Sequence, residues 1–147
     1  MPTFREISHQ SADYDATVIL RERILRQPLG LAFTEAELAA ESNDHHLAAF
    51  DDGSEELIGC LVFTPLSDDE WKMRQVAVVE NRRGEGIGRI LVYLAEGFAR
   101  CRGVRTIVLH ARAEVVPFYL ALGYSVEGDP FVEVTIPHRR MRKRLDS

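Results

Sequence analysis

Residues 73–94 read MRQVAVVENRRGEGIGRILVYL, an apolar segment that passes through a glycine-rich polar loop into an amphipathic one. The apolar segment from Met73 to Val78 has the composition of a strand. After the loop, apolar residues recur at i, i+3, i+4 and i+7 from Ile87 onward, which predicts a helix that ends at Gly103. A strand, a glycine-rich loop and a helix therefore follow one another at the centre of the chain.

The loop at 83–88 predicts a site for a phosphate group. Glycine lets the backbone approach an anion closely, and the first turn of a helix offers unpaired N–H groups at its positive end. Arg82 and Arg83 add cationic charge beside it. The Gly-Lys-Ser/Thr ending of a Walker loop is absent, and G-x-G-x-G at 84–88 differs from the Rossmann spacing. A glycine-rich turn without a ligand is the remaining alternative.

The rest of the chain alternates strands and helices around this segment. The capping-box pattern at Thr34 and Glu37 starts one helix, and Gly123 follows another as its expected left-handed end. Pro117 must lie in the first helical turn. We predict helices at 12–26, 35–42 and 113–122, and strands at 3–8, 46–50, 57–63, 70–79, 106–110, 124–127, 131–136 and 138–145. This order predicts an α/β (α+β) fold with one mixed sheet and helices on both faces, in a single domain over residues 1–147.

The composition is that of a globular protein. The chain has 147 residues, of which 46% are hydrophobic and 28% charged. No apolar run reaches the roughly 18 residues of a membrane-spanning helix, and the first residues lack the pattern of a signal peptide. Cys60 and Cys101 are expected to be two buried, reduced thiols in a cytoplasmic protein, and neither a disulfide framework nor a zinc site is expected.

The charge is unevenly distributed. The 18 basic and 23 acidic residues give a net charge of −5, and five of the basic residues fall within 139–144. The acidic remainder argues against nucleic-acid binding and favours cationic substrates such as amines. The basic stretch is expected to be a solvated edge strand, with a nucleic-acid arm as the alternative.

Two segments resemble a known family. RGEGIG at 83–88 matches the R/Q-x-x-G-x-G/A motif of the GNAT family of N-acetyltransferases, and the flanking strand and helix match in type. PFYLALGY at 117–124 resembles the family's FY-x-x-x-G-F/Y segment. GDPF at 128–131 and IPHRRM at 136–141 resemble an ElaA-like or YjcF-like bacterial subgroup. The resemblance implies a mostly antiparallel, twisted sheet of about seven strands, the acyl-CoA N-acyltransferase fold.

The resemblance also implies an activity and a cofactor site. Family members bind acetyl-CoA as a cosubstrate and transfer its acetyl group directly to an amine. The pantetheine arm would pair with the strand edge at Val76, Ala77 and Val78. The pyrophosphate would lie on the backbone amides of Arg83, Gly84, Glu85, Gly86, Ile87 and Gly88. The Glu85 side chain is expected to point away from it. No metal is expected, since the pair His45–His46 lacks a third ligand.

The strand before the loop contains a change of phase. Trp71 and Met73 are apolar at odd positions, whereas Val76 and Val78 are apolar at even positions. A β-bulge produces such a change. It would separate this strand from strand 106–110 and open a slot for the cofactor. A strand buried on both faces is the alternative.

The reaction requires an acid and a base. An amine with a pKa near 10 must lose a proton before it attacks. By resemblance, Tyr119 protonates the departing thiolate; the alternative is a core residue whose hydroxyl bonds to a carbonyl. Glu80 and Glu133 are the candidate bases, with His110 and His138 as alternatives.

The acceptor is not encoded in a recognisable motif. We expect segments 27–45 and 128–138 to select it, whether it is a small molecule or a protein. No nucleic-acid or membrane partner is expected, and a homodimer is possible. A non-catalytic module that binds or senses acyl-CoA is the alternative to an enzyme.

Overall fold

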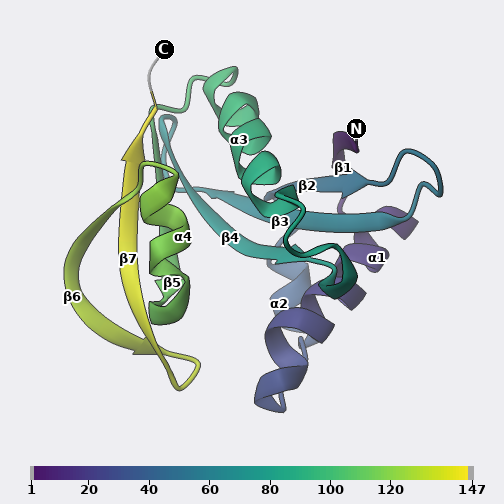
Figure 1. Cartoon of the computed structure of the whole chain (residues 1–147), viewed down its shortest axis with the longest axis horizontal. Coiled ribbons are helices and arrows are strands. Elements are labelled where there is room, and N and C mark those ends of the chain that lie inside the picture. Colours follow the sequence, from purple (N-terminus) through teal and green to yellow (C-terminus); the bar gives the residue numbers. More distant parts are fainter. Residues whose placement is uncertain (1, 146–147) are drawn as a thin grey trace. The chain divides into compact units, whose positions relative to one another are not determined.

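The computed structural model describes residues 2–145, which contain seven strands and four α-helices. The strands are β1 (Thr3–Ile7), β2 (His45–Phe50), β3 (Leu57–Pro65), β4 (Glu70–Val78), β5 (Thr106–Arg112), β6 (Ser125–Glu133) and β7 (Ile136–Arg144). The helices are α1 (Ala12–Arg21), α2 (Glu35–Ala39), α3 (Ile87–Arg100) and α4 (Val116–Ala121). The strand order is β1-β2-β3-β4-β5-β7-β6, with β4 and β5 parallel (Figure 1). The predicted mixed, seven-stranded sheet is confirmed.

Residue contacts divide the chain into two compact units. The first combines the residues up to Thr64 with Gln75–Ala95, and the second combines Pro65–Arg74 with the residues from Glu96 onward. Strand β4 and helix α3 each contribute residues to both units. The single domain over residues 1–147 stays a prediction.

In the first unit, α1 and the start of α3 cover opposite faces of β3 (Figure 1). Cys60 of β3 packs in a buried cluster with Leu20 of α1. Gly59, its neighbour, faces α3. A Cβ on Gly59 would lie 3.3 Å from the carbonyl oxygen of Ala77 and 3.5 Å from Leu91 Cδ2. The contact with α3 would be an ordinary one, whereas the Ala77 carbonyl of β4 would have to give way, so it is the neighbouring strand that favours glycine here.

The segment predicted as a helix over 12–26 is helical, but not throughout in the α form. Helix α1 is followed by a π-helical turn at Glu22–Arg26 and a 3₁₀ turn at Gln27–Leu29. Gly30, with a φ of +72°, ends it. The predicted capping box of α2 is present, although α2 ends at Ala39 and not at residue 42.

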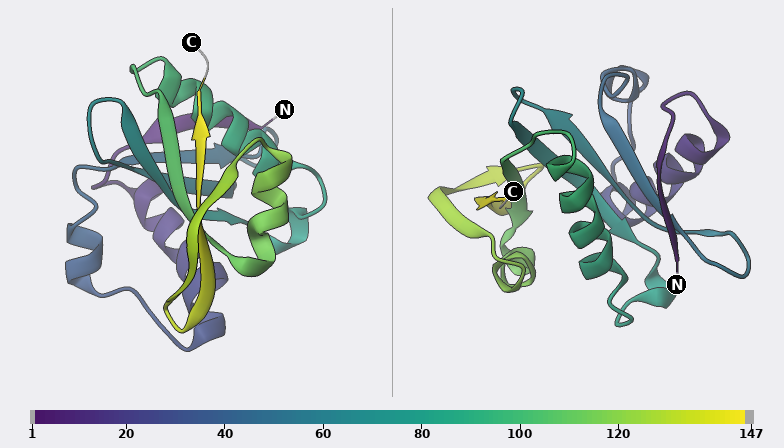
Figure 2. Two further views of the ribbon diagram at one scale, coloured as in Figure 1. Left: turned by 90° about the vertical axis from the view of Figure 1, so that its left-hand side faces the viewer. Right: turned by 90° about the horizontal axis from the view of Figure 1, so that it is seen from above.

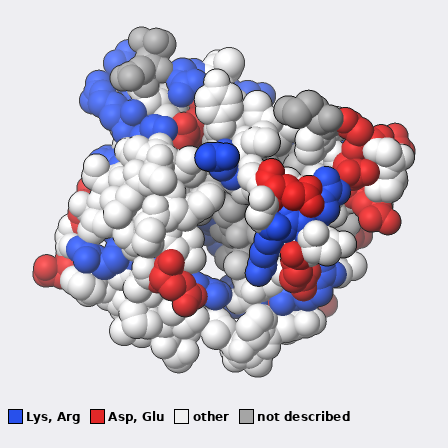
Figure 3. Space-filling view, in the orientation of Figure 1, with Lys and Arg blue, Asp and Glu red and all other residues white. Residues whose placement is uncertain are grey.

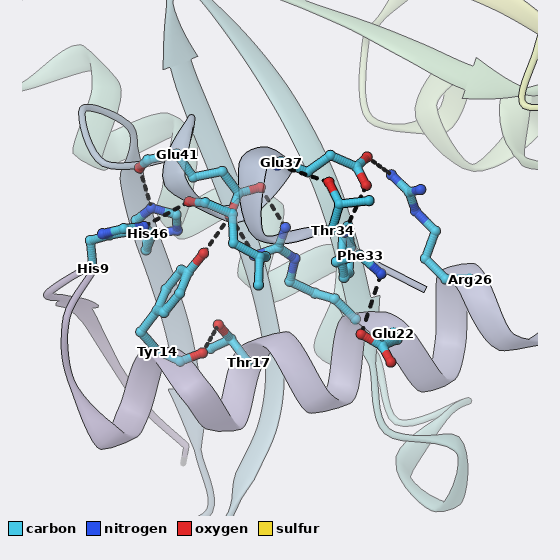
Figure 4. A network of polar contacts seen from close by, with 12 residues as sticks. His9, Tyr14, Thr17, Glu22, Arg26, Phe33, Thr34, Glu37, Glu41 and His46 are labelled. Carbon is cyan, nitrogen blue, oxygen red and sulfur yellow. Dashed lines mark hydrogen bonds and ion pairs between the residues drawn. The ribbon is translucent and has the colours of Figure 1, made fainter. Parts of the chain in front are cut away.

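A buried ion pair between Arg21 and Glu41 links the end of α1 to the segment that follows α2. Arg21 is completely buried, and its Nη1 donates to Oε1 of Glu41 at 3.0 Å while its Nη2 donates to Oε2. The Tyr14 hydroxyl donates to the same carboxylate at 2.8 Å, and Nε2 of His46 lies 3.0 Å from the Glu41 carbonyl oxygen (Figure 4). Burial acts to raise the pKa of Glu41, but the bonds from Arg21 and Tyr14 outweigh it and lower the pKa. Glu41 therefore stays ionised inside the protein.

In the second unit, β7 lies between β5 and β6 (Figure 2). The prediction of an edge strand at 138–145 is therefore wrong. An interior strand tolerates these cations because acids on other elements pair with them. Arg142 donates to Glu70 at 2.8 Å and to Glu127 at 2.9 Å, and Lys143 donates to Glu96 at 2.9 Å.

Exposed positive charge in the second unit gathers around the turn between α3 and β5 and the end of β7, at the upper left of Figure 3. Of the basic residues within 139–144, only Arg144 is exposed. The exposed arginines of this region are Arg100, Arg102, Arg105 and Arg144.

The hairpin of β6 and β7 differs from the prediction. The strands predicted at 124–127 and 131–136 form one strand, β6, whose register shifts between Glu127 and Phe131. Val134 and Thr135 form the turn, with φ values of +51° and +63°. β-Branched residues rarely adopt this conformation, so their sequence favours a strand and gives no sign of a turn.

Three local predictions have different outcomes. Cys60 is buried as predicted, whereas Cys101, which follows the last residue of α3, is exposed, so its predicted burial is wrong. Pro117 lies in the first turn of α4, and Gly123 has a φ of +95°, both as predicted.

None of the helices within residues 2–145 has the length and apolar character needed to cross a membrane.

Candidate functional site

Strand β4 changes its orientation at Gln75, whose φ is +56°. Before this residue, the ring of Trp71 lies 6.2 Å from that of Phe98 on α3. After it, Ala77 packs in the buried cluster beside α1. The buried residues of β4 are Trp71, Met73 and Ala77, which all lie at odd positions, so the shift of the buried face to Val76 and Val78 that the apolar pattern indicated is not present. A β-bulge in this strand stays a prediction.

The proposed pantetheine edge, Val76 to Val78, lies directly beyond Gln75. The parallel ladder of β4 and β5 runs from Glu70–Thr106 to Met73–Leu109. Ala77 is buried, whereas Val76 and Val78 are half-buried. Ala77 is therefore the buried residue of this segment, whereas the apolar pattern had indicated burial of Val76 and Val78.

The glycine-rich loop leads into an N-terminus of α3 with free amides. Gly84 and Gly86 have φ values of +87° and +79°, and a Cβ on Gly84 would meet no atom within 4 Å. The Ile90 amide donates to the Gly86 carbonyl at 3.0 Å and closes the first helical turn. No residue among 2–145 accepts a hydrogen bond from the amides at 84–88. These N–H groups, at the positive end of a helix, are suited to an anion.

The Arg83 amide differs from the others because it donates to the Glu80 carbonyl at 3.3 Å. The Arg83 side chain is exposed and forms no ion pair within the described part of the chain. Arg83 can therefore contribute its guanidinium to an anion, while its amide is already used.

The Glu85 carboxylate is held by Arg82 and not by the free amides. Arg82 Nε donates to Glu85 at 2.9 Å, and its Nη1 donates to Asp51 at 2.9 Å. Asp51 also accepts bonds from the amides of Gly53 and Ser54 in the β2–β3 turn. The Ser54 amide and then the Arg82 guanidinium lower the pKa of Asp51 to about 2. The expectation that the Glu85 side chain leaves the amides free agrees with this contact.

Glu80, a predicted base, lies in the first unit and is ion-paired. Arg23 Nη2 lies 3.2 Å from its carboxylate, which is about half exposed. The amide of Glu80 itself and then Arg23 lower the pKa of this carboxyl. A carboxylate with a lowered pKa is a weaker base.

Tyr119, the predicted acid, lies on α4 in the second unit and is 7% exposed. Its ring packs edge-on against Phe118 and Tyr124 at centroid distances of 5.0 and 5.6 Å. No hydrogen bond of its hydroxyl is seen within residues 2–145, so the alternative of a hydroxyl bonded to a carbonyl gains no support there. Burial raises the pKa of Tyr119, which keeps the hydroxyl protonated at neutral pH.

Glu133 lies in a cluster with both histidines that were alternative bases. His110 Nδ1 is 3.0 Å from Glu133 Oε1, and His138 Nε2 is 3.7 Å from Oε2. Lys72 Nζ is 3.3 Å from the same His110 Nδ1. The ring of Phe131 packs against both imidazoles, at centroid distances of 4.9 and 5.8 Å. The second unit thus brings together four titratable side chains from β4, β5, β6 and β7.

Burial lowers the pKa of Lys72, and the charges of Arg74 and Arg140 act in the same direction. For Glu133, burial acts to raise the pKa, but the bond and charge of His110 outweigh it and lower the pKa. Sequence reasoning missed Lys72. Its one available signal was its rarity, since the chain has only two lysines.

The two adjacent histidines of β2 are separated by the strand's alternation. His45 Nδ1 lies 3.0 Å from Glu6 at the surface, whereas His46 is buried in the Glu41 network. Within residues 2–145 no three His, Cys, Asp or Glu side chains are placed to hold a metal ion.

A family model, related sequences and solved structures all match this chain. A model described as "Acetyltransferase (GNAT) family" matches residues 10–124. The uncharacterized N-acetyltransferase YjcF of Bacillus subtilis is 26% identical over 125 residues, which cover 84% of this chain and 87% of YjcF. Escherichia coli ElaA has a TM-score of 0.81 at 18% identity, over 97% of this chain and 99% of ElaA. An aminoglycoside 6'-N-acetyltransferase complexed with coenzyme A has a TM-score of 0.79 at 19% identity, over 97% and 96% of the two chains. Both structures share the fold of this chain.

Proposed function

The chain belongs to the acetyltransferase (GNAT) family, with YjcF and ElaA among its relatives, and we propose on this premise that it transfers an acetyl group from acetyl-CoA to an amine. The acceptor would be a small molecule or a protein amine. The acidic net charge of −5 supports a cationic acceptor.

The observation that carries this proposal is the row of unpaired amides at 84–88, at the start of α3. They would hold the pyrophosphate of coenzyme A, with the Arg83 guanidinium beside them. The backbone of Val76, Ala77 and Val78 would pair with the pantetheine arm as an added strand does. A structural relative that is complexed with coenzyme A supports coenzyme A as the ligand, while the residues that hold it are our proposal.

Acetyl-CoA would supply a thioester, and the side chains would manage the protons. Tyr119, which is protonated at neutral pH, would donate to the departing thiolate. The cluster around Glu133, which includes the imidazoles of His110 and His138, is better suited to take the amine proton than Glu80, whose carboxylate pairs with Arg23 and has no imidazole of residues 2–145 in contact with it. Free thiols at Cys60 and Cys101 support a cytoplasmic site of action. Homodimer formation stays a prediction.

A panel of amines tests the proposed function. We expect acetyl-CoA-dependent release of thiol with at least one class among polyamines, aminoglycosides, amino acids and peptide N-termini. Binding of acetyl-CoA should be measured in parallel by calorimetry. Binding without turnover on every class would favour the non-catalytic acyl-CoA-binding module, and absence of binding would contradict both functions.

The Arg82–Glu85 contact leads to a second expected result. Arg82→Ala should weaken acetyl-CoA binding about tenfold, because the freed Glu85 carboxylate can turn to the amides and repel the phosphates. Glu85→Gln alone should leave the Kd nearly unchanged, and Arg82→Ala/Glu85→Gln should restore it. Calorimetric titration measures all three variants.

Arg83→Ala provides the comparison for this pair. Its guanidinium is expected to contact the phosphates directly, so its loss should not be rescued by Glu85→Gln. If the double variant of Arg82 and Glu85 binds as weakly as Arg82→Ala, Arg82 contacts the cofactor itself and does not act through Glu85.

A further inference from the structure

His110 and Glu133 form the shortest side-chain contact of the cluster in the second unit, at 3.0 Å. We propose that this pair removes the proton from the acceptor amine, and that Lys72 controls which ring nitrogen of His110 carries the hydrogen. The inference rests on the proposed acetyl transfer, and it adds His110 as the base and Glu133 as its orienting carboxylate.

The hydrogen-bond geometry selects the tautomer of His110. Its Nδ1 lies 3.0 Å from Glu133 Oε1, and a carboxylate can only accept, so Nδ1 carries the hydrogen in this contact. The lone pair then lies on Nε2, which can take a proton from an ammonium group. After that step the imidazolium still donates to Glu133, which stabilises its charge. The amine keeps the electron pair that attacks the thioester, and the proton later leaves Nε2 for solvent.

Lys72 competes with Glu133 for the same nitrogen. Its Nζ lies 3.3 Å from His110 Nδ1. A charged Lys72 that donates to Nδ1 needs the lone pair there, which moves the ring hydrogen to Nε2 and leaves that nitrogen unable to accept a proton. A neutral Lys72 leaves Nδ1–H to Glu133. The two contacts therefore correspond to an inactive and an active tautomer.

The other histidine of the cluster is not placed to act in this way. His138 Nδ1 donates to the Ile136 carbonyl at 2.7 Å, and only 7% of its side chain is exposed. The His110 side chain is 23% exposed, and Glu133 is 43% exposed. His110 is thus the imidazole that a substrate can reach.

Charged groups on each neighbouring strand act on this pair. Lys72 and Arg74 lie on β4, and Glu133 lies on β6. On β7, Arg140 stands opposite His110 in the register, with its guanidinium bonded to Glu127 at 2.6 Å, and His138 shares the Glu133 carboxylate. Of these charged side chains within residues 2–145, Lys72 and Glu133 are the two whose polar atoms contact the His110 ring, both at Nδ1.

Rates measured across pH test the pair, with the best amine of the panel as substrate. His110→Gln should lower kcat about 100-fold near pH 7 and recover toward the wild-type value near pH 10, where the amine is already neutral. Lys72→Met removes a cation and should move the acid limb of the profile to higher pH. Glu133→Gln removes an anion and should move the same limb to lower pH. A merely structural role would not produce shifts in opposite directions.

His45→Gln is the matched control, because His45 Nδ1 also lies 3.0 Å from a glutamate, Glu6, at similar exposure. It should behave as the wild type. All variants should bind acetyl-CoA with unchanged Kd, which confirms that they fold. Two results with an active wild type would overturn the assignment of His110 and Glu133 while acetyl transfer stands. One is a His110→Gln variant whose kcat at neutral pH equals that of His45→Gln. The other is that the acid limbs of Lys72→Met and Glu133→Gln do not move in opposite directions. A wild type that binds acetyl-CoA but acetylates no amine overturns both.

Discussion

Arg21→Met is expected to lower the free energy of unfolding by about 3–5 kcal/mol, because it leaves the buried Glu41 carboxylate without its cation. The side chain of Arg21 is completely buried, and both of its Nη atoms donate to Glu41. A loss of this size is a large share of the roughly 5–15 kcal/mol that stabilises a typical domain. Urea unfolding followed by circular dichroism measures it as a lower midpoint at an unchanged slope.

Arg23→Met is the matched control for this variant. Arg23 follows two residues later and also pairs with a glutamate, Glu80, but both side chains are about half exposed. Its loss should leave the midpoint nearly unchanged, since exposed ion pairs contribute little. Arg21→Met/Glu41→Leu should recover part of the stability, because it removes the unpaired charge. Equal midpoints for Arg21→Met and Arg23→Met would show that the buried pair contributes no more than a surface one.

Tyr119→Phe is expected to reduce kcat about 100-fold while the Kd for acetyl-CoA stays unchanged. The hydroxyl has no partner within the described residues, so its removal costs no internal hydrogen bond. Its raised pKa keeps the hydroxyl protonated at neutral pH, and it also makes the phenol a weaker acid toward the thiolate. Steady-state rates and calorimetric titration of the same protein preparation separate turnover from binding.

Tyr124→Phe distinguishes a chemical role from a packing role. The ring of Tyr124 lies 5.6 Å from that of Tyr119, but its hydroxyl donates to Glu96 at 2.9 Å. We expect this variant to lose stability and to keep its turnover. If Tyr119→Phe keeps the wild-type kcat, the proton comes from another group and Tyr119 serves only the core.

The parts of the fold that were predictable depend on local signals. The loop at 84–88, the capping box before α2 and the proline in α4 are each specified by a few adjacent residues. The turn at Val134–Thr135 was not predictable, since two β-branched residues adopt positive φ there. The place of β7 was also missed, because its cations are neutralised by acids far away in the sequence, such as Glu70 for Arg142.

The same distinction applies to the candidate site. Tyr119 and the glycine loop were found through short motifs. Arg21 and Glu41 are 20 residues apart, and Lys72 and His110 are 38 apart, so no periodic pattern relates them. Burial of Arg21 was not expected either, because an arginine at helical spacing among apolar residues usually extends its charged end to water.

The anchoring of Arg82 by Asp51 makes a surface hairpin part of the surroundings of the proposed coenzyme A site. Asp51 orders the β2–β3 turn through the Gly53 and Ser54 amides and holds the arginine that restrains Glu85. Hairpin tips usually accept insertions, tags or grafted epitopes freely. At this turn we expect such changes to displace Arg82, 31 residues downstream of Asp51, and so to alter the affinity for coenzyme A. Anyone engineering this protein should choose a different attachment point.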